Sequence, residues 1–221
     1  IAYVINHAGD RAVIVDASLL PLFEPVVPLL ESVEHLVVFG GETTFPGLTC
    51  VGYGELLGGQ DAAYDWPELD ETAAAAVCYT SGTTGNPKGV LYDHRSTVLH
   101  AFATLAIDVA GASSRDVVLP VVPFFHVNAW GIPYSAMIAG AKLVLPGPKM
   151  GDGEALYELM DSEDVTMALG VPTVWLALLQ YCESAGKRLD KLQRTVIGGA
   201  AVPRWPWASS SACSSTFSSA S

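Results

Sequence analysis

The residues best suited to chemistry lie between Tyr79 and Gly89, where the chain reads YTSGTTGNPKG. Glycines let a backbone turn tightly and approach a ligand closely, and successive exposed N–H groups in such a turn form a concavity that favours anions. Hydroxyl groups add short donors, and Lys88 adds a point charge suited to phosphate. A solvated Gly/Ser/Thr linker is the alternative. Because apolar AAAAVCY leads in and VLYDHRS leads out to a helix-like stretch, we favour a phosphate-binding loop after a buried strand.

This loop does not have the spacing of a Walker A loop, GxxxxGK[ST]. Gly82 and Gly85 are only three residues apart, Pro87 precedes Lys88, and Gly89 follows it. The lysine therefore lacks both the glycine before it and the hydroxyl after it that the Walker motif requires. We do not expect a P-loop nucleoside triphosphatase.

The composition limits the classes of partner. The chain has 221 residues, half of them hydrophobic, which is enough for a substantial core and fits a single globular domain. Its net charge of −12 argues against a nucleic-acid backbone or an anionic membrane as partner. Any polyanion that binds must therefore be held by local donors rather than by the overall field of the protein.

Cysteine and histidine spacing gives no sign of a metal site. The four cysteines show no CxxC spacing and the five histidines no HExxH pattern, so thiols in a reducing compartment are the favoured reading over disulfides or a metal. The uncharged stretch 117–141 is long enough to consider as a membrane span, but prolines interrupt it. We expect a cytoplasmic protein without a transmembrane segment, with peripheral membrane association as an alternative.

Apolar runs alternate between strand and helix character. Predicted strands are 11–16, 35–39, 73–79, 90–92, 117–122, 142–146, 167–170 and 195–197. Predicted helices are 2–8, 18–30, 96–109 with Ser96 as N-cap, 129–139, 154–161 and 173–182. Residues 43–70 are read as a surface excursion in which no strand runs into GYGELLGG, and 198–201 as a tight turn. The predicted fold class is α/β, with doubly wound, mostly parallel sheets and flanking helices, in which ligands bind at the strand ends.

The motifs resemble one enzyme superfamily. YTSGTTGNPKGV matches the full phosphate-loop signature of the adenylate-forming (AMP-binding) enzymes, and residues 119–147, LPVVPFFHVNAWGIPYSAMIAGAKLVLPG, resemble medium- and long-chain fatty acyl-CoA synthetases. GVPTVW and VIGGAAVPR follow in that family's order. The resemblance covers residues 1–204, read as a partial AMP-binding N-terminal domain. Residues 205–221, about half serine, are interpreted as a frame-shifted or disordered tail.

The resemblance implies roles for particular residues. Thr80 resembles the residue whose hydroxyl helps to hold Mg²⁺, and His126 the active-site histidine beside the carboxylate. Trp130 resembles the gate of the acyl tunnel, Val127 a residue near the nucleotide, and Gly198 and Gly199 a turn close to adenine and acyl chain. The implied phosphate cradle consists of Ser81, Gly82, Thr83, Thr84, Gly85 and the catalytic Lys88. A solvated lysine, a core histidine and a core tryptophan are the corresponding structural alternatives.

The implied function is ATP-dependent activation of a fatty or related carboxylic acid to an acyl-adenylate and then to acyl-CoA, with Mg²⁺, ATP and coenzyme A. In the family a metal-sharing Glu, a ribose-binding Asp and a catalytic Lys follow the position of Arg204, and we expect the chain without them not to form adenylates. The alternatives are a non-catalytic nucleotide-binding fragment, a ligase for a short thioether acid such as 3-methylmercaptopropionate, and luciferase-type oxidation or carrier-protein loading. A homodimer of the full-length protein is also left open.

Overall fold

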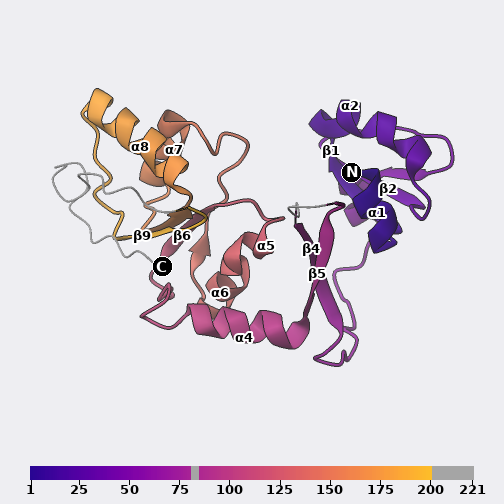
Figure 1. The fold of residues 1–221 in the computed structure, drawn as a ribbon, viewed down its shortest axis with the longest axis horizontal. Helices are drawn as coiled ribbons and strands as arrows, with labels where there is room; N and C mark the ends of the chain where they lie inside the picture. Colours follow the sequence, from indigo (N-terminus) through magenta and orange to yellow (C-terminus); the bar gives the residue numbers. More distant parts are fainter. Residues whose placement is uncertain (81–84, 201–221) are drawn as a thin grey trace. The chain divides into compact units, whose positions relative to one another are not determined.

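A computed structural model describes residues 1–80 and 85–200 (Figure 1). The predictions for Ser81, Gly82, Thr83 and Thr84, and for residues 201–221, lie outside the described residues. The chain divides into two compact units. The first contains Ile1–Asp70 with Tyr79–Val90, and the second contains Glu71–Cys78 with the chain from Leu91 onward.

The first unit is built on a parallel sheet of order β1-β2-β3. Its elements are α1 (Ala2–Ala8), β1 (Ala12–Asp16), η1 (Ala17–Leu19), α2 (Leu20–Phe23), η2 (Glu24–Leu29), β2 (His35–Phe39), β3 (Thr49–Gly52) and α3 (Tyr53–Gly58). The parallel pairing of β1 with β2 confirms the predicted strand–helix–strand unit. The single helix predicted over 18–30 is wrong: prolines lack an N–H and split this segment into short 3-10 and α turns.

Part of the predicted surface excursion over 43–70 is also wrong. β3 pairs in parallel with β2 and runs directly into α3, which carries the GYGELLGG sequence. The strand consists of only Thr-Cys-Val-Gly, too short for a clear apolar run, and glycines around it suggested turns. The core of this unit joins Leu36 and Val38 of β2 to Ile5 of α1, Val15 of β1 and Phe23 of α2.

Two strands flank the glycine-rich loop, as predicted, but the first is not the buried strand that was expected, because Cys78 is its one buried residue. β4 (Ala74–Thr80) and β5 (Lys88–Asp93) form a separate two-stranded sheet. β5 leads directly into α4 (His94–Thr104), whose N-cap is Asp93 and not the predicted Ser96. The Asp93 carboxylate accepts a hydrogen bond from the Ser96 N–H (2.6 Å), while the Ser96 hydroxyl accepts one from the Asp93 N–H (3.1 Å). Ser96 is thus the reciprocal partner of a capping box, three residues into the helix.

The second unit contains a four-stranded parallel sheet of order β7-β6-β8-β9. Its strands are β6 (Val117–Val121), β7 (Lys142–Leu143), β8 (Met167–Gly170) and β9 (Arg194–Ile197), and its helices include α6 (Ile132–Ala139), α7 (Gly153–Ser162) and α8 (Pro172–Ala185). β7 is shorter than the predicted 142–146, because only Lys142 and Leu143 pair with β6. All four strands are parallel, as the prediction requires.

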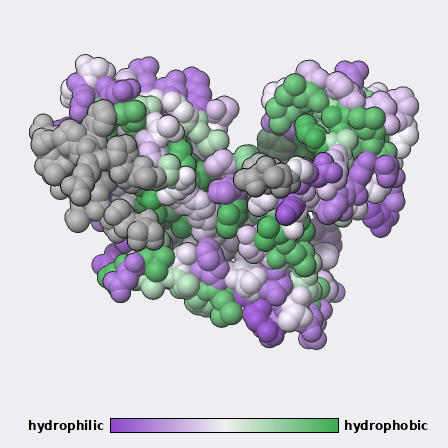
Figure 2. Space-filling model, in the orientation of Figure 1, coloured by the Kyte–Doolittle hydropathy of each residue, from purple (hydrophilic) through white to green (hydrophobic). Residues whose placement is uncertain are grey.

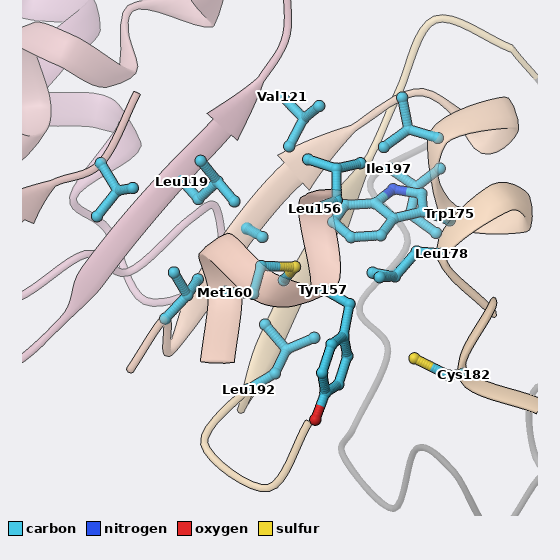
Figure 3. Packing of buried hydrophobic residues seen from close by; sticks show 14 residues of the cluster. Leu119, Val121, Leu156, Tyr157, Met160, Trp175, Leu178, Cys182, Leu192 and Ile197 are labelled. Atoms are coloured by element: carbon cyan, nitrogen blue, oxygen red, sulfur yellow. The ribbon is translucent and has the colours of Figure 1, made fainter. Parts of the chain in front are cut away.

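Apolar side chains cover both faces of this sheet. On one face Leu119 packs with Leu156 and Met160 of α7 and with Trp175 and Leu178 of α8 (Figure 3). On the other face a second cluster gathers Val118, Met167 and Leu169 against Ile132 of α6. Burying one such side chain stabilises the fold by about 1.5–3 kcal/mol. Helices on both faces confirm the doubly wound α/β class.

The helix predicted over 129–139 begins later, at Ile132, because the preceding turn has the opposite hand. α5 (Val127–Trp130) has positive φ angles at Val127 (49°), Ala129 (52°) and Trp130 (57°). A left-handed turn costs about 1–2 kcal/mol per non-glycine residue, since Cβ crowds the following carbonyl oxygen. Nothing in residue types predicts this conformation, which surrounding packing must hold.

Within residues 1–80 and 85–200, no helix combines the length and the apolar character needed to cross a bilayer.

Candidate functional site

The strand order of the second unit creates a place for a ligand at the carboxyl edge of its sheet. After β6 the chain adds β7 on one side, and then returns to place β8 on the other side of β6. The connections that leave β6 therefore diverge at this point. In open parallel sheets, ligands bind outside the carboxyl ends of the strands at such a reversal of order. The segments that follow β6 and β9 contain the predicted residues of this unit.

His126 ends the short segment that follows β6. Its backbone N–H donates to the Pro123 carbonyl (3.1 Å), and its own carbonyl accepts from the Ala129 N–H (3.1 Å), so the segment turns tightly. The side chain is exposed, which removes the core-histidine alternative. An exposed imidazole at a sheet edge is available to bond a substrate carboxylate or an anionic intermediate.

The indole ring of Trp130 lies against Gly198. A Cβ atom at Gly198 would come within 2.9 Å of Cη2 and 3.2 Å of Cζ2 of Trp130, closer than a side chain tolerates. Gly198 follows β9, and its N–H donates to the carbonyl of Gly170 at the end of β8 (3.4 Å). Gly199 has φ of 82° and lies against Val171. The structure therefore brings together the segments after β6, β8 and β9.

A pocket of about 210 Å³ adjoins the left-handed turn. On the side of the left-handed turn, the pocket is lined by Val127, Gly131 and Tyr134. The opposite wall contains residues that sequence reasoning missed, namely Tyr92, Ser96, Thr97 and His100. Ser96, Thr97 and His100 lie on one face of α4, but His94, Arg95 and Thr104 are polar too, so the sequence of the helix did not single this face out.

Packing holds the left-handed turn in place. Ala129 is fully buried, Trp130 packs against the cluster around Val118 and Ile132, and Val127 is partly exposed at the pocket. A Cβ at Gly131, whose φ is 69°, would overlap the imidazole of His100. Strained backbone of this kind persists only where its surroundings fix it, and it is concentrated at functional sites.

The base of the glycine-rich loop belongs to the first unit. The Thr80 hydroxyl, at the end of β4, donates a long hydrogen bond to the Lys88 carbonyl at the start of β5 (3.5 Å). Both side chains are exposed, and Gly85 has φ of 88°. Among the described residues, the ion pairs do not involve Lys88. Its ammonium group is thus presented to solvent, where a phosphate can approach it.

Thr80 fits the magnesium role that the resemblance implies. The described residues contain no group of three or more His, Cys, Asp or Glu that could enclose a metal ion. Mg²⁺ does not need such a cage, because it commonly binds through one or two protein oxygens and completes its shell with waters and substrate phosphates. The exposed Thr80 hydroxyl oxygen is a donor of this kind.

Comparisons with known proteins agree with these features. The AMP-binding enzyme family matches residues 1–215. The chain is 53% identical over 206 residues to a 3-methylmercaptopropionyl-CoA ligase of Ruegeria pomeroyi, which covers 92% of the chain and 38% of that protein. It is 50% identical over 208 residues to a medium-chain-fatty-acid–CoA ligase of Ectopseudomonas oleovorans, with the same two coverages. The chain thus spans well under half the length of these relatives.

A solved structure supports the fold independently. The anthranilate CoA ligase crystallised with anthranoyl-AMP superposes with a TM-score of 0.80, over 98% of this chain and 41% of that one, at 21% identity. At this identity the likeness establishes the fold alone. The match of the family over residues 1–215 identifies this chain as a member of the AMP-binding enzyme family.

Proposed function

We propose that the protein carrying this chain is an acid–thiol ligase that activates a carboxylic acid with ATP and transfers the acyl group to coenzyme A. The observation that carries the proposal is the meeting of three strand ends at one sheet edge, with exposed His126 and the Trp130–Gly198 contact. Because the chain belongs to the AMP-binding family, we assign the activation of a carboxylic acid with ATP to this edge of the sheet. The relatives named as CoA ligases support coenzyme A as the acceptor of the acyl group.

The proposed reaction has two steps. A carboxylate oxygen attacks the α-phosphorus of ATP and the bond to the β-phosphate oxygen breaks, which gives an acyl-adenylate and pyrophosphate. The coenzyme A thiolate then attacks the acyl carbon and AMP leaves. Bound Mg²⁺ would neutralise phosphate charge in the first step, with Thr80 as its protein oxygen. The chain's own contribution is mostly positioning and charge neutralisation, which suits phosphoryl chemistry.

Each proposed residue has one task. Lys88 neutralises charge on the β- and γ-phosphates, and Gly85 together with Ser81, Gly82, Thr83 and Thr84 supplies donors to the same groups. His126 bonds the carboxylate and the anion that develops at the reacting centre. Trp130 closes the acyl path against Gly198, whereas Val127 and Gly199 border the ligand.

The identity of the acid has two candidates. The relatives point to a short thioether acid, 3-methylmercaptopropionate, and to a medium-chain fatty acid, at 53% and 50% identity. The higher identity is to the ligase for the thioether acid, and on this ground we propose that a short acid is preferred over a long one.

The decisive experiment is acid-dependent exchange of labelled pyrophosphate into ATP by the full-length protein, with 3-methylmercaptopropionate and straight-chain acids of increasing length. We expect exchange with the short acids, and a loss of about 100-fold in kcat for His126→Ala. His35→Ala, an exposed histidine on β2, is the matched control and should be unaffected. MgATP binding without exchange for any acid would instead support a non-catalytic nucleotide-binding protein.

A further inference from the structure

A histidine far away in the sequence holds the residue that precedes Thr80. The Nδ1 atom of His7, on α1, lies 2.7 Å from the hydroxyl oxygen of Tyr79, the penultimate residue of β4. The two rings also meet edge to face, with centroids 5.7 Å apart and planes at 83°. Both residues belong to the first unit. The contact therefore joins α1 to the strand that leads into the glycine-rich loop.

α1 is itself fixed to the body of this unit. Ile5 is buried in the core around β2. The Asn6 side chain donates to the Leu29 carbonyl (2.8 Å) and accepts from the Glu31 N–H (3.1 Å), which ties the helix to the end of η2. Three consecutive residues thus connect the core, η2 and Tyr79. His7 is placed on a rigid support.

Tyr79 remains a neutral phenol in this environment. Burial raises the pKa of Tyr79, and the charges of Tyr3 and Asp10 raise it further. Near neutral pH the phenol therefore keeps its proton. A neutral imidazole can either accept from this hydroxyl or donate to its oxygen, so both tautomers of His7 can make the bond.

We propose that His7 is a positioning residue for Thr80. Successive side chains on a strand point to opposite faces, so fixing the Tyr79 side chain also fixes the direction of the Thr80 hydroxyl. The other end of this arrangement is the long Thr80–Lys88 hydrogen bond, which alone would hold the hydroxyl weakly. His7 thereby presents Thr80 to the metal-bound phosphates of ATP. The role rests on the proposed function of Thr80, and His7 itself touches no reacting atom.

The test compares KM values in the full-length protein. His7→Leu and Tyr79→Phe should each raise the KM for MgATP about threefold to tenfold, the effect of one neutral hydrogen bond, and leave the KM for the acid unchanged. The double variant should be no worse than either single one, because both remove the same bond. His7→Asn places an amide where Nδ1 was and should restore a low KM, whereas His7→Gln reaches the Nε2 position and should not.

A matched control and a second measurement separate this role from a merely structural one. His35→Leu removes an exposed histidine of the same unit and should change neither KM. Without any ligand, the backbone amides of Tyr79, Thr80 and Lys88 should exchange faster in His7→Leu than in the native protein. Additive single variants, equal changes in both KM values, or unchanged exchange would overturn the proposal. If the native protein forms no adenylate, the proposed function fails, but the exchange experiment still decides whether His7 holds the end of β4.

Discussion

Gly198 shows how a single missing side chain shapes the proposed acyl path. Its Cα lies so close to Trp130 that any Cβ would press on the indole ring. Trp130 in turn follows Ala129 in a left-handed turn that is packed into the sheet's core. The ring and the glycine are thus a matched pair, and residue types at both positions are constrained together.

We predict that Gly198→Ala displaces the Trp130 ring. Overpacking costs about 1–3 kcal/mol, so kcat/KM for the preferred acid should fall roughly 5- to 100-fold. The KM for MgATP should change little, because the clash is with the indole ring. Steady-state kinetics with acids of several lengths measures this. Gly54→Ala is the control, since a Cβ there meets no atom within 4 Å. An unchanged kcat/KM for the acid would show that the Trp130 ring can move aside without any effect on the reaction of the acid.

At the scale of elements, a buried carboxylate ties together the amino ends of three strands. Asp116, directly before β6, accepts hydrogen bonds from the Arg194 guanidinium of β9, from Thr166 directly before β8 (3.0 Å) and from the Ser113 N–H and hydroxyl (2.7 and 2.9 Å). Arg194 also donates to the Gly111 carbonyl (2.7 Å). The network lies at the sheet edge opposite the candidate site, which indicates a role in stability.

This network predicts a pH dependence of stability. Burial alone would raise the pKa of Asp116, but the hydrogen bonds from Arg194, Ser113 and Thr166 outweigh it and lower the pKa. A depressed carboxyl pKa contributes stability above the unfolded value of about 3.9, and that contribution is lost as pH falls through the lower folded value. Asp116→Asn should cost about 2 kcal/mol at neutral pH and flatten the acid side of the profile. Urea denaturation below about pH 4 and at neutral pH measures both. A variant that keeps the native acid profile would exclude Asp116 as its source.

α7 and α8 meet through a glycine. A Cβ at Gly153, the first residue of α7, would overlap the Ala177 carbonyl oxygen of α8 and come within 2.8 Å of its carbon. Backbone atoms in a helix cannot move aside as a flexible side chain can. Gly153→Ala should therefore lower the free energy of unfolding by about 3 kcal/mol. Gly151→Ala, where a Cβ meets nothing within 4 Å, should be neutral. Thermal unfolding of the two variants tests the contact, and equal stabilities would contradict it.

The elements differ in how far sequence alone could predict them. β2 and β8 are continuous apolar runs, and α7 places Leu156, Tyr157 and Met160 at helical spacing, so all three were predicted within about two residues. β3 was missed because a strand of four residues is too short to show an alternating pattern of apolar and polar residues. The left-handed turn was missed because only tertiary packing can hold Val127 and Trp130 at positive φ.

The residues of the candidate site also differ in how far sequence alone could predict them. His126, Trp130 and Gly198 were proposed as site residues because they stand in a recognisable motif order, and the structure brings Trp130 and Gly198 into contact. His100 and Tyr134 were not found, because their joint presence in one pocket depends on α4 packing beside α6. Tertiary neighbours without a motif of their own leave little trace in a single sequence. His7 is another such residue, separated from Tyr79 by 72 positions.

At the scale of the whole molecule, a strongly negative net charge is combined with many exposed hydrophobic side chains. Hydrophobic residues reach the surface of both units (Figure 2), for example Ile14 and Leu22 in the first and Leu99 and Phe102 in the second. The net charge is nevertheless −12. Under the proposed function, this charge repels ATP at long range. We then expect binding to come from groups within a few ångströms, such as Lys88, Thr80 and backbone N–H donors.

Long-range repulsion combined with close contacts predicts an unusual dependence of the MgATP affinity on salt concentration. Long-range repulsion is screened when the Debye length falls from about 30 Å at 0.01 M to about 8 Å at 0.15 M ionic strength, whereas close contacts are screened much less. The affinity for MgATP should therefore stay constant or rise slightly over this range, measured by calorimetry at fixed Mg²⁺. A protein that binds polyanions through its overall field would lose affinity steeply, as nucleic-acid binders do. Lys88→Met should weaken binding at both salt concentrations. A steep loss of affinity with salt in the native protein would show that an extended basic surface, and not the local donors of the loop, holds the phosphates.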